Sequence, residues 1–425
     1  MIGGLLKSTS SAALFAAVGL FALGAGVPAA TAADLGGDCC ADLEERVAEL
    51  EATTARKGNR RVSLTVSGQV STALMAWNDG ENSDTYVVDN VPSGGTFFAF
   101  SGSAKINPSL SAGYNITIAL DTGSRSHQVN ANDDDGTTGA GNLTTGPRST
   151  GGFDTDIVLT LANWYLDHSQ LGRITVGRIN TATAGTVTVD LGGAGVIANA
   201  QVGYWQRGFT DPNTGQTWAN LLGGNTVNGS SLSRANAISY TSPTVGGLSV
   251  SAAWGENDVW DAAVRYAGEF SGFRVAAALG YASNLSGLGD VSEERGVTAG
   301  GPQPTQIKGS ASILHVATGL YLTGAYVDQD NDTAGRDNTT LWYVQGGIAK
   351  NWTGLGNTVV YGEYTQIDNA FDNISDSTVF GVGIVQHIDA AAMELFLAYR
   401  QYSADWGNVS ANDFDIVMGG ARIRF

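Results

Sequence analysis

The chain has 425 residues and a formal net charge of −18 at pH 7, with 15% charged residues, 58 glycines and 8 prolines. Ordinary globular proteins have about 25% charged residues and about 7% glycine, so this composition favours many strands joined by turns around a crowded interior. The acidic excess excludes nucleic acid as a partner, because binding to phosphates needs a basic face.

Residues 1–33 are predicted to be a secretory signal peptide. Lys7 supplies the positive charge, residues 12–27 form an apolar run, and Ala30-Thr31-Ala32 is a small-residue cleavage site. A transmembrane anchor is the alternative interpretation of the same run. Beyond this segment no stretch of about 18 apolar residues occurs, which argues against a bundle of membrane-spanning helices.

Residues 34–60 are predicted to form a helical segment ahead of the main domain. Its helix covers residues 39–57, and the apolar positions have the spacing of a short heptad seam: Cys40, Leu43, Val47, Leu50 and Thr54. A helix this short is marginal alone, so it either joins copies from other chains or lies against its own domain. Cys39 and Cys40 are neighbours in the chain, so a disulfide between them would be strained, and bonds between chains are the alternative.

Residues 61–425 are predicted to form an all-β domain, because apolar residues recur there with period two. Each alternating segment has about the ten residues that a tilted strand needs to cross a bilayer. We therefore expect a 16-stranded antiparallel transmembrane β-barrel with a short N-terminal periplasmic helix. The sixteen segments are 62–77, 96–106, 110–122, 153–167, 172–181, 232–242, 247–255, 258–268, 273–283, 306–315, 319–328, 340–351, 357–367, 377–388, 392–403 and 413–425.

The connectors between these segments alternate between short turns and longer, mostly polar and acidic loops. Bacterial outer-membrane barrels have short periplasmic turns and long external loops. An even number of strands puts both ends of the barrel on the short-turn side, so the helix at 39–57 is expected in the periplasm.

One connector, residues 182–231, differs from the others by being apolar and rich in glycine. It contains two acidic residues, Asp190 and Asp211. Long loops without secondary structure are usually functional, and this composition avoids water. We expect it to fold into the barrel lumen and constrict it; an external flap over the barrel is the alternative.

The final strand alternates small or apolar residues with arginines and ends at Phe425. With this ending, the segments DCCADLEERVAELEATTARKGNRRVSLTVSGQVSTALM, GRITVGRIN and RANAISYTSPTVGGLSVSAAW resemble the general porins of alphaproteobacteria. The resemblance covers essentially the whole mature chain. It implies a homotrimer in the outer membrane that passes small hydrophilic solutes, a third external loop that folds inward, and a terminal aromatic residue read by the barrel-assembly machinery.

The resemblance also suggests residues at the constriction, where porins set basic wall residues against acidic residues of the inner loop. Arg178, from the step Gly177-Arg178, and Arg234 are carried over as pore-lining residues, and Asp190 is the acidic candidate in the loop. Lys105 lies in the second strand region, where Phe97 and Phe98 stand in place of a basic residue found in many porins. The expected transverse field is therefore reduced.

Strand parity independently places further charged residues in the lumen. Arg265, Glu363 and Arg400 alternate with apolar residues and are expected to face inward, as are Asp261 and Glu394. A charge on the lipid face would cost about 2–4 kcal/mol near the bilayer midplane. A position at the solvated rim of the barrel is the alternative for each.

The sequence therefore predicts a passive diffusion channel and no enzyme, cofactor or metal site. Asp328, Asp330 and Asp332 begin like a calcium loop but lack its later ligands, and they suit loose divalent-ion binding among lipopolysaccharides. The acidic total suggests a mild cation preference. The alternatives are a structural anchor attached to peptidoglycan and a sugar- or peptide-selective channel, in which loop aromatic residues would form a sliding surface: Tyr204, Trp205, Phe209 and Trp218.

Overall fold

The computed structural model describes residues 62–121, 126, 129, 156–205, 208–223, 234–255, 259–283 and 303–425, except for 91, 93 and 371. The predicted signal peptide, the predicted helix at 39–57 and its two cysteines lie outside these residues. Within them, no helix is both long and apolar enough to cross a membrane.

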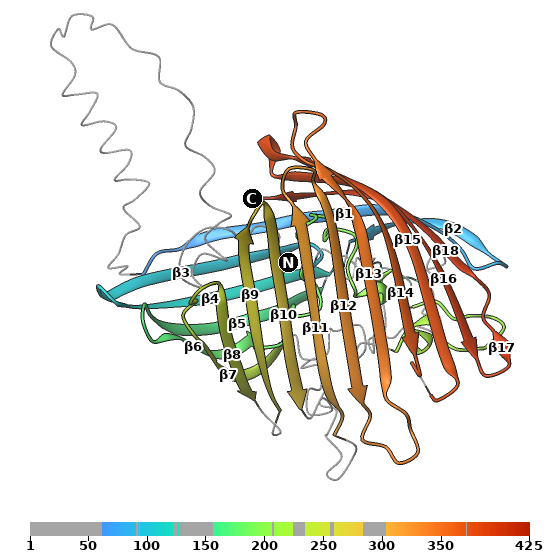
Figure 1. Ribbon diagram of the computed structural model, residues 1–425, viewed down its shortest axis with the longest axis horizontal. Helices are drawn as coiled ribbons and strands as arrows, with labels where there is room; N and C mark the ends of the chain where they lie inside the picture. The colour runs from blue at the N-terminus through green and yellow to red at the C-terminus, as the bar shows by residue number, and fades with distance from the viewer. Residues whose placement is uncertain are drawn as a thin grey trace, which may run out of the picture.

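The described chain forms one antiparallel sheet that closes on itself, because the first strand pairs with the last (Figure 1). The first nine strands are β1 (Thr65–Asn78), β2 (Ser83–Asp89), β3 (Phe97–Asn107), β4 (Leu110–Asp121), β5 (Asp156–His168), β6 (Gly172–Asn180), β7 (Arg234–Thr241), β8 (Leu248–Gly255) and β9 (Trp260–Phe270). The others are β10 (Phe273–Ser283), β11 (Thr305–His315), β12 (Leu320–Asp330), β13 (Thr339–Lys350), β14 (Thr358–Asp368), β15 (Ser375–Ile388), β16 (Met393–Trp406), β17 (Val409–Ser410) and β18 (Phe414–Arg424).

These strands make sixteen crossings of the barrel, as the sequence predicts. β2 pairs with the second half of β1 and β3 with its first half, so β2 and β3 share one crossing. β17 is a two-residue extension next to β18. The prediction missed β2, which lies within the expected connector 78–95. Its buried apolar side chains are Tyr86 and Val88, and the polar residues at its start hide their alternation.

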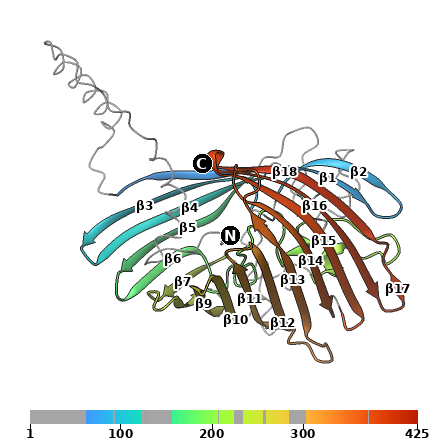
Figure 2. The same cartoon turned by 45° about the horizontal axis from the view of Figure 1, so that its top comes forward.

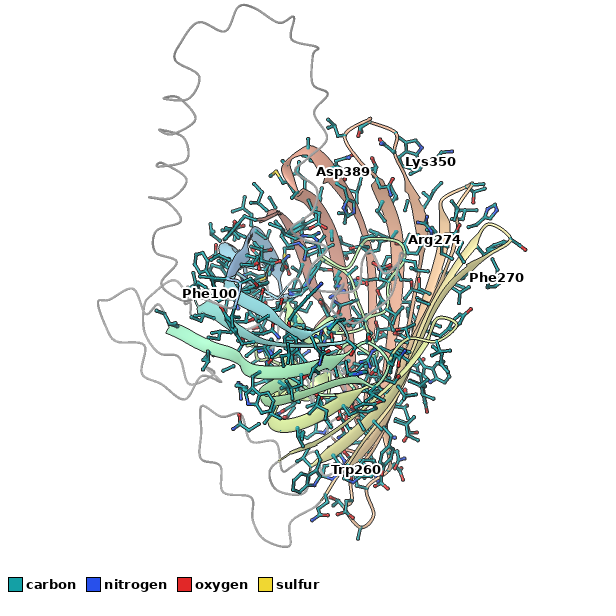
Figure 3. The ribbon with its side chains drawn as sticks, turned by 90° about the vertical axis from the view of Figure 1, so that its left-hand side faces the viewer. Phe100, Trp260, Phe270, Arg274, Lys350 and Asp389 are labelled. Carbon is teal, nitrogen blue, oxygen red and sulfur yellow. The ribbon has the colours of Figure 1, made fainter. Side chains whose placement is uncertain are left out.

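The short turns gather at one end of the barrel, which is called the short-turn end below, and the other end is called the long-loop end. Figure 3 places Phe270, Arg274, Lys350 and Asp389 at the short-turn end and Trp260 at the opposite end. The turn geometry explains some of the glycines. At Gly172 φ is +89°, and a Cβ there would lie 2.3 Å from the carbonyl oxygen of Thr241, so only glycine fits.

The two faces of the wall have the alternation expected of a membrane barrel. On β1, Val70 and Leu74 are 47% and 58% exposed, whereas Met75 and Trp77 are buried. On β18, Val417 and Ile423 point outward while Met418 and Arg422 are buried inside. The apolar outward face suits lipid, and the inward face carries the polar side chains.

Candidate functional site

The described part of the chain between β6 and β7 lies inside the barrel against its wall. We call residues 181–205 and 208–223 the inner segment; it contains a 3-10 turn, η3 (Val202–Tyr204), and a short helix, α3 (Trp218–Leu221). Its trace lies among β12 to β16 (Figure 2), and most of its side chains are buried. The following contacts with the wall hold it there.

The start of the inner segment is clamped by two charged residues of β9. The carboxylate of Asp261 accepts hydrogen bonds from the backbone N–H of Ala182 at 3.0 Å and from both the N–H and the hydroxyl of Thr183 at 2.7 Å. The guanidinium of Arg265 donates to the carbonyl oxygens of Ala182 at 2.6 Å and Ala184 at 2.8 Å. Both charges point inward, as strand parity predicts, and both are used to fix the segment.

Asp190 organises a tight turn in the middle of the inner segment. Its carboxylate accepts hydrogen bonds from the backbone N–H groups of Gly192 at 2.7 Å, Gly193 at 3.0 Å and Gly195 at 3.0 Å. Burial raises the pKa of this carboxyl, and the same amides oppose the rise by stabilising the charged form. A Cβ at Gly192 would lie 2.2 Å from the ring of Tyr321 on β12, so the backbone approaches the wall as closely as glycine permits.

Hydroxyl and imidazole groups of the wall continue this attachment. On β11, the hydroxyl of Ser310 accepts from the N–H of Val189, and the hydroxyl of Ser312 accepts from the N–H of Leu191, both at 3.1 Å. On β15, Nε2 of His387 lies 3.1 Å from the carbonyl oxygen of Gly193. Two strands, β11 and β15, therefore contact this part of the segment through polar groups.

Glu363 and Arg400 form an ion pair beneath the inner segment. The Arg400 Nε and Glu363 Oε1 atoms are 2.6 Å apart, and each side chain is 1% exposed. The hydroxyl of Tyr343 donates to Glu363 at 2.8 Å, and the ring of Trp205 packs 4.4 Å from the guanidinium of Arg400. Both residues face inward as expected, but the segment separates them from water, so they do not line an open pore.

The aromatic residues of the inner segment pack against the wall. The ring of Phe209 lies 4.7 Å from Trp77 on β1, and Trp218 lies 6.0 Å from Tyr402 on β16. Trp205, Phe209 and Trp218 are each no more than 1% exposed. This burial removes three of the four rings from the expected sliding surface for solutes, whereas Tyr204 is partly buried.

The inner segment covers one side of the lumen wall and leaves the other side open. On the three strands that the segment covers, lumen-facing side chains are buried: Lys308, Ser310 and Ser312 on β11, Thr323 and Ala325 on β12, and Leu341 and Gln345 on β13. Many lumen-facing side chains on β3 to β7 are partly exposed: Ser101, Ser111, Asn115, Thr117, Asn163, Tyr165, Thr175 and Ser239. Ala119, Ile179 and Ala235, near the long-loop end of the same face, are buried. Within the described residues, water therefore reaches the wall on the side of β3 to β7.

The remaining predicted wall residues fall on different faces. Lys105 lies on the lumen face of β3 and is exposed. Arg178 and Arg234 do not share that face. Arg178 is in phase with the outward Ile174 on β6, and Arg234 is in phase with the outward Ile238 on β7. The expectation that these two arginines line the lumen is corrected by this register.

Two features of the lumen wall were missed by the sequence analysis. Asp167 and Arg173 form an ion pair with a distance of 2.7 Å across a short turn, and Arg173 lies 4.1 Å from the ring of Tyr165. Lys308 is fully buried on the inward face of β11. Strand parity could have found all three charges, since each alternates with outward apolar neighbours.

The end of the chain completes the closure of the barrel. Phe425 and Gly68 exchange backbone hydrogen bonds at 2.9 and 3.1 Å. The Phe425 ring is 49% exposed on the outer surface, with its centroid 5.8 Å from that of Phe98. The terminal residue therefore joins the last strand to the first and presents an aromatic ring outward.

Comparisons with known proteins agree with this architecture. A family profile described as Gram-negative porin matches residues 13–422. An anion-selective porin from Comamonas acidovorans has a TM-score of 0.56 at 16% identity, covering 86% of this chain and 100% of that chain. The trimer form of OmpT from Vibrio cholerae has a TM-score of 0.52 at 12% identity, with the same two coverages. The outer membrane channel DcaP of Acinetobacter baumannii has a TM-score of 0.50 at 8% identity, covering 86% and 97%.

A search of curated protein sequences gives no significant match. The identities to the solved structures are low, so those likenesses concern the fold.

Proposed function

Because the chain belongs to the Gram-negative porin family and is a passive channel of the outer membrane, we propose a path for its solutes. Solutes pass between the inner segment and the wall formed by β3 to β7. The observation that carries the proposal is the difference in burial between the two sides of the lumen. Lumen-facing residues such as Asn115 and Ser239 are partly exposed, whereas Lys308 and Gln345 are buried behind the segment. Pore width and wall chemistry then select the solutes.

We propose that the permeant solutes are small and hydrophilic. The exposed side carries hydroxyl and amide groups, which exchange hydrogen bonds with water or with a passing solute at little cost. Lys105 is proposed to line this path, while Arg265 and Asp190 shape its edge by fixing the inner segment. Passage of this kind requires no covalent step, cofactor or catalytic residue.

We propose a homotrimer in which the short-turn end faces the periplasm and lipopolysaccharide surrounds the long-loop end. The similarity in shape to the trimer form of OmpT supports the assembly. Recognition of Phe425 by the assembly machinery and attachment of the mature N-terminal end to peptidoglycan stay predictions.

Single-channel recording in planar bilayers tests the proposal, with the intact protein and with a deletion of 186–200. Stable conductance steps in groups of three that grow on deletion are the expected result, because the deletion removes the part of the segment attached to β11 and β15. Heat-modifiable mobility in gels confirms that each variant is a folded barrel. A folded barrel without conductance would refute the channel and favour the structural anchor.

A further inference from the structure

A row of charged and hydroxyl side chains crosses the open wall, beginning at the short-turn end. The strand register pairs Lys105 with Ser111, Ser111 with Asp167, and Asp167 with Arg173. All four residues therefore face the lumen on neighbouring strands, next to the short turns. The ion pair of Arg173 with Asp167, at 2.7 Å, neutralises the middle of the row.

The row continues toward the middle of the wall. Arg173 pairs with Thr241, and Thr241 pairs with Ser251 on β8. The hydroxyl of Ser251 accepts a hydrogen bond from Arg265 at 3.0 Å. The cations Lys105, Arg173 and Arg265, which we call the basic row, thus follow one another across neighbouring strands from the short-turn end of β3 to β9, with Ser111, Asp167, Thr241 and Ser251 between them.

Lys105 is the cation of this row with the most freedom to meet a solute. Its side chain is exposed, and within the described residues it has no hydrogen bond or ion pair. Arg173 is held by Asp167, and Arg265 by two carbonyl groups of the inner segment. An ammonium group without a partner attracts anions, since no fixed carboxylate cancels its field.

The carboxylates near the row cancel only part of its charge. Asp261 is 1% exposed and occupied by amides of the inner segment, and Glu363 is paired with Arg400 beneath that segment. Asp190 is surrounded by amide groups of its own turn. Of the described residues that face the open side, two carboxylates lie beside the basic row, and each is paired with an arginine: Asp167 with Arg173 at 2.7 Å and Glu269 with Arg274 at 2.8 Å.

We propose that the basic row gives the pore a preference for small anions, such as solutes carrying a phosphate or carboxylate group, although the whole chain has a net charge of −18. The inference rests on the proposed water path along β3 to β7. It reverses the cation preference suggested by the total charge, because acidic residues outside the lumen contribute little to the field along the path when salt screens them.

Reversal potentials in a KCl gradient test the inference, using the intact protein, Lys105→Gln and Lys350→Gln. Lys350 is the matched control, because it is an exposed lysine at the short-turn end whose strand parity points outward (Figure 3). At about 0.1 M salt the Debye length is about 10 Å, so the field of Lys105 reaches a passing ion. Screening at this salt concentration leaves about half of the interaction energy, so a unit charge about 7 Å away raises the local concentration of an anion about 1.6-fold and lowers that of a cation by the same factor. The ratio of the two ions therefore changes about threefold.

The expected result is chloride preference in the intact protein and an anion-to-cation permeability ratio about threefold lower in Lys105→Gln, with little change in Lys350→Gln. Cation preference of the intact protein would overturn the inference, and so would an unchanged ratio in Lys105→Gln or an equal drop in the control. Conductance steps distinguish a failure of the basic row from a failure of the channel itself. Steps with the wrong selectivity refute the basic row alone, whereas a folded barrel without steps refutes the channel as well.

Discussion

Removal of the Asp261 carboxylate should release the start of the inner segment while leaving the barrel closed. Asp261 accepts three hydrogen bonds, from Ala182 at 3.0 Å and from the amide and hydroxyl of Thr183 at 2.7 Å. Hydrogen bonds to a charged group contribute about 1.5–3 kcal/mol each. Because water will replace part of the loss, we use the lower value, which gives about 4.5 kcal/mol for the three bonds.

A free-energy change of this size shifts the equilibrium between attached and detached segment roughly a thousandfold. The assay is single-channel recording of Asp261→Ala, in which we expect more open-channel noise and a larger mean conductance than in the intact protein. The control is Asp330→Ala, which removes an exposed carboxylate at the end of β12. If Asp261→Ala folds and conducts as quietly as the control, the clamp does not hold the segment and the reasoning fails.

Two further variants examine the buried ion pair and the chain end. Arg400→Met leaves Glu363 buried without its cation, so the barrel should lose about 3–5 kcal/mol of stability in urea titrations, while the double variant Glu363→Gln with Arg400→Met should recover much of it. Equal stability of the single and double variants would contradict this account. Phe425→Ala should lower the yield of folded barrel in cells but change stability after refolding in detergent by no more than about 1.5 kcal/mol, since its ring has one aromatic neighbour, Phe98. An equally low yield for Phe270→Ala, another exposed aromatic residue, would remove the special role of the terminal position.

The barrel itself was predictable because each crossing repeats the same physical pattern. On β1 and β18 the outward apolar residues, such as Leu74 and Val417, alternate with buried inward residues such as Met75 and Met418. A strand between lipid and lumen has no other stable arrangement, so the number of strands and most strand bounds follow from period two alone. β2 escaped because its alternation is brief and begins among polar residues.

The positions of single charges were less predictable, and the reason differs between residues. Arg178 and Arg234 were placed in the lumen by likeness to other porins, although Arg178 is in phase with the outward Ile174. At the ends of strands, beyond the apolar band, a charge is tolerated on either face, so residue type gives no orientation there. Register decides the face, and register depends on pairing with neighbouring strands.

The sequence by itself determined the barrel, the direction of side chains along each strand and the unusual composition of residues 182–231. Only the tertiary structure decided that the inner segment lies against one side of the lumen, hiding Glu363 and Arg400 while leaving Lys105 exposed. The physical reason is the range of the interactions. Alternation is a local property of a strand. The position of the inner segment instead depends on Asp261, Ser310 and other wall groups, which are distant in the chain and contact the segment only when the barrel closes.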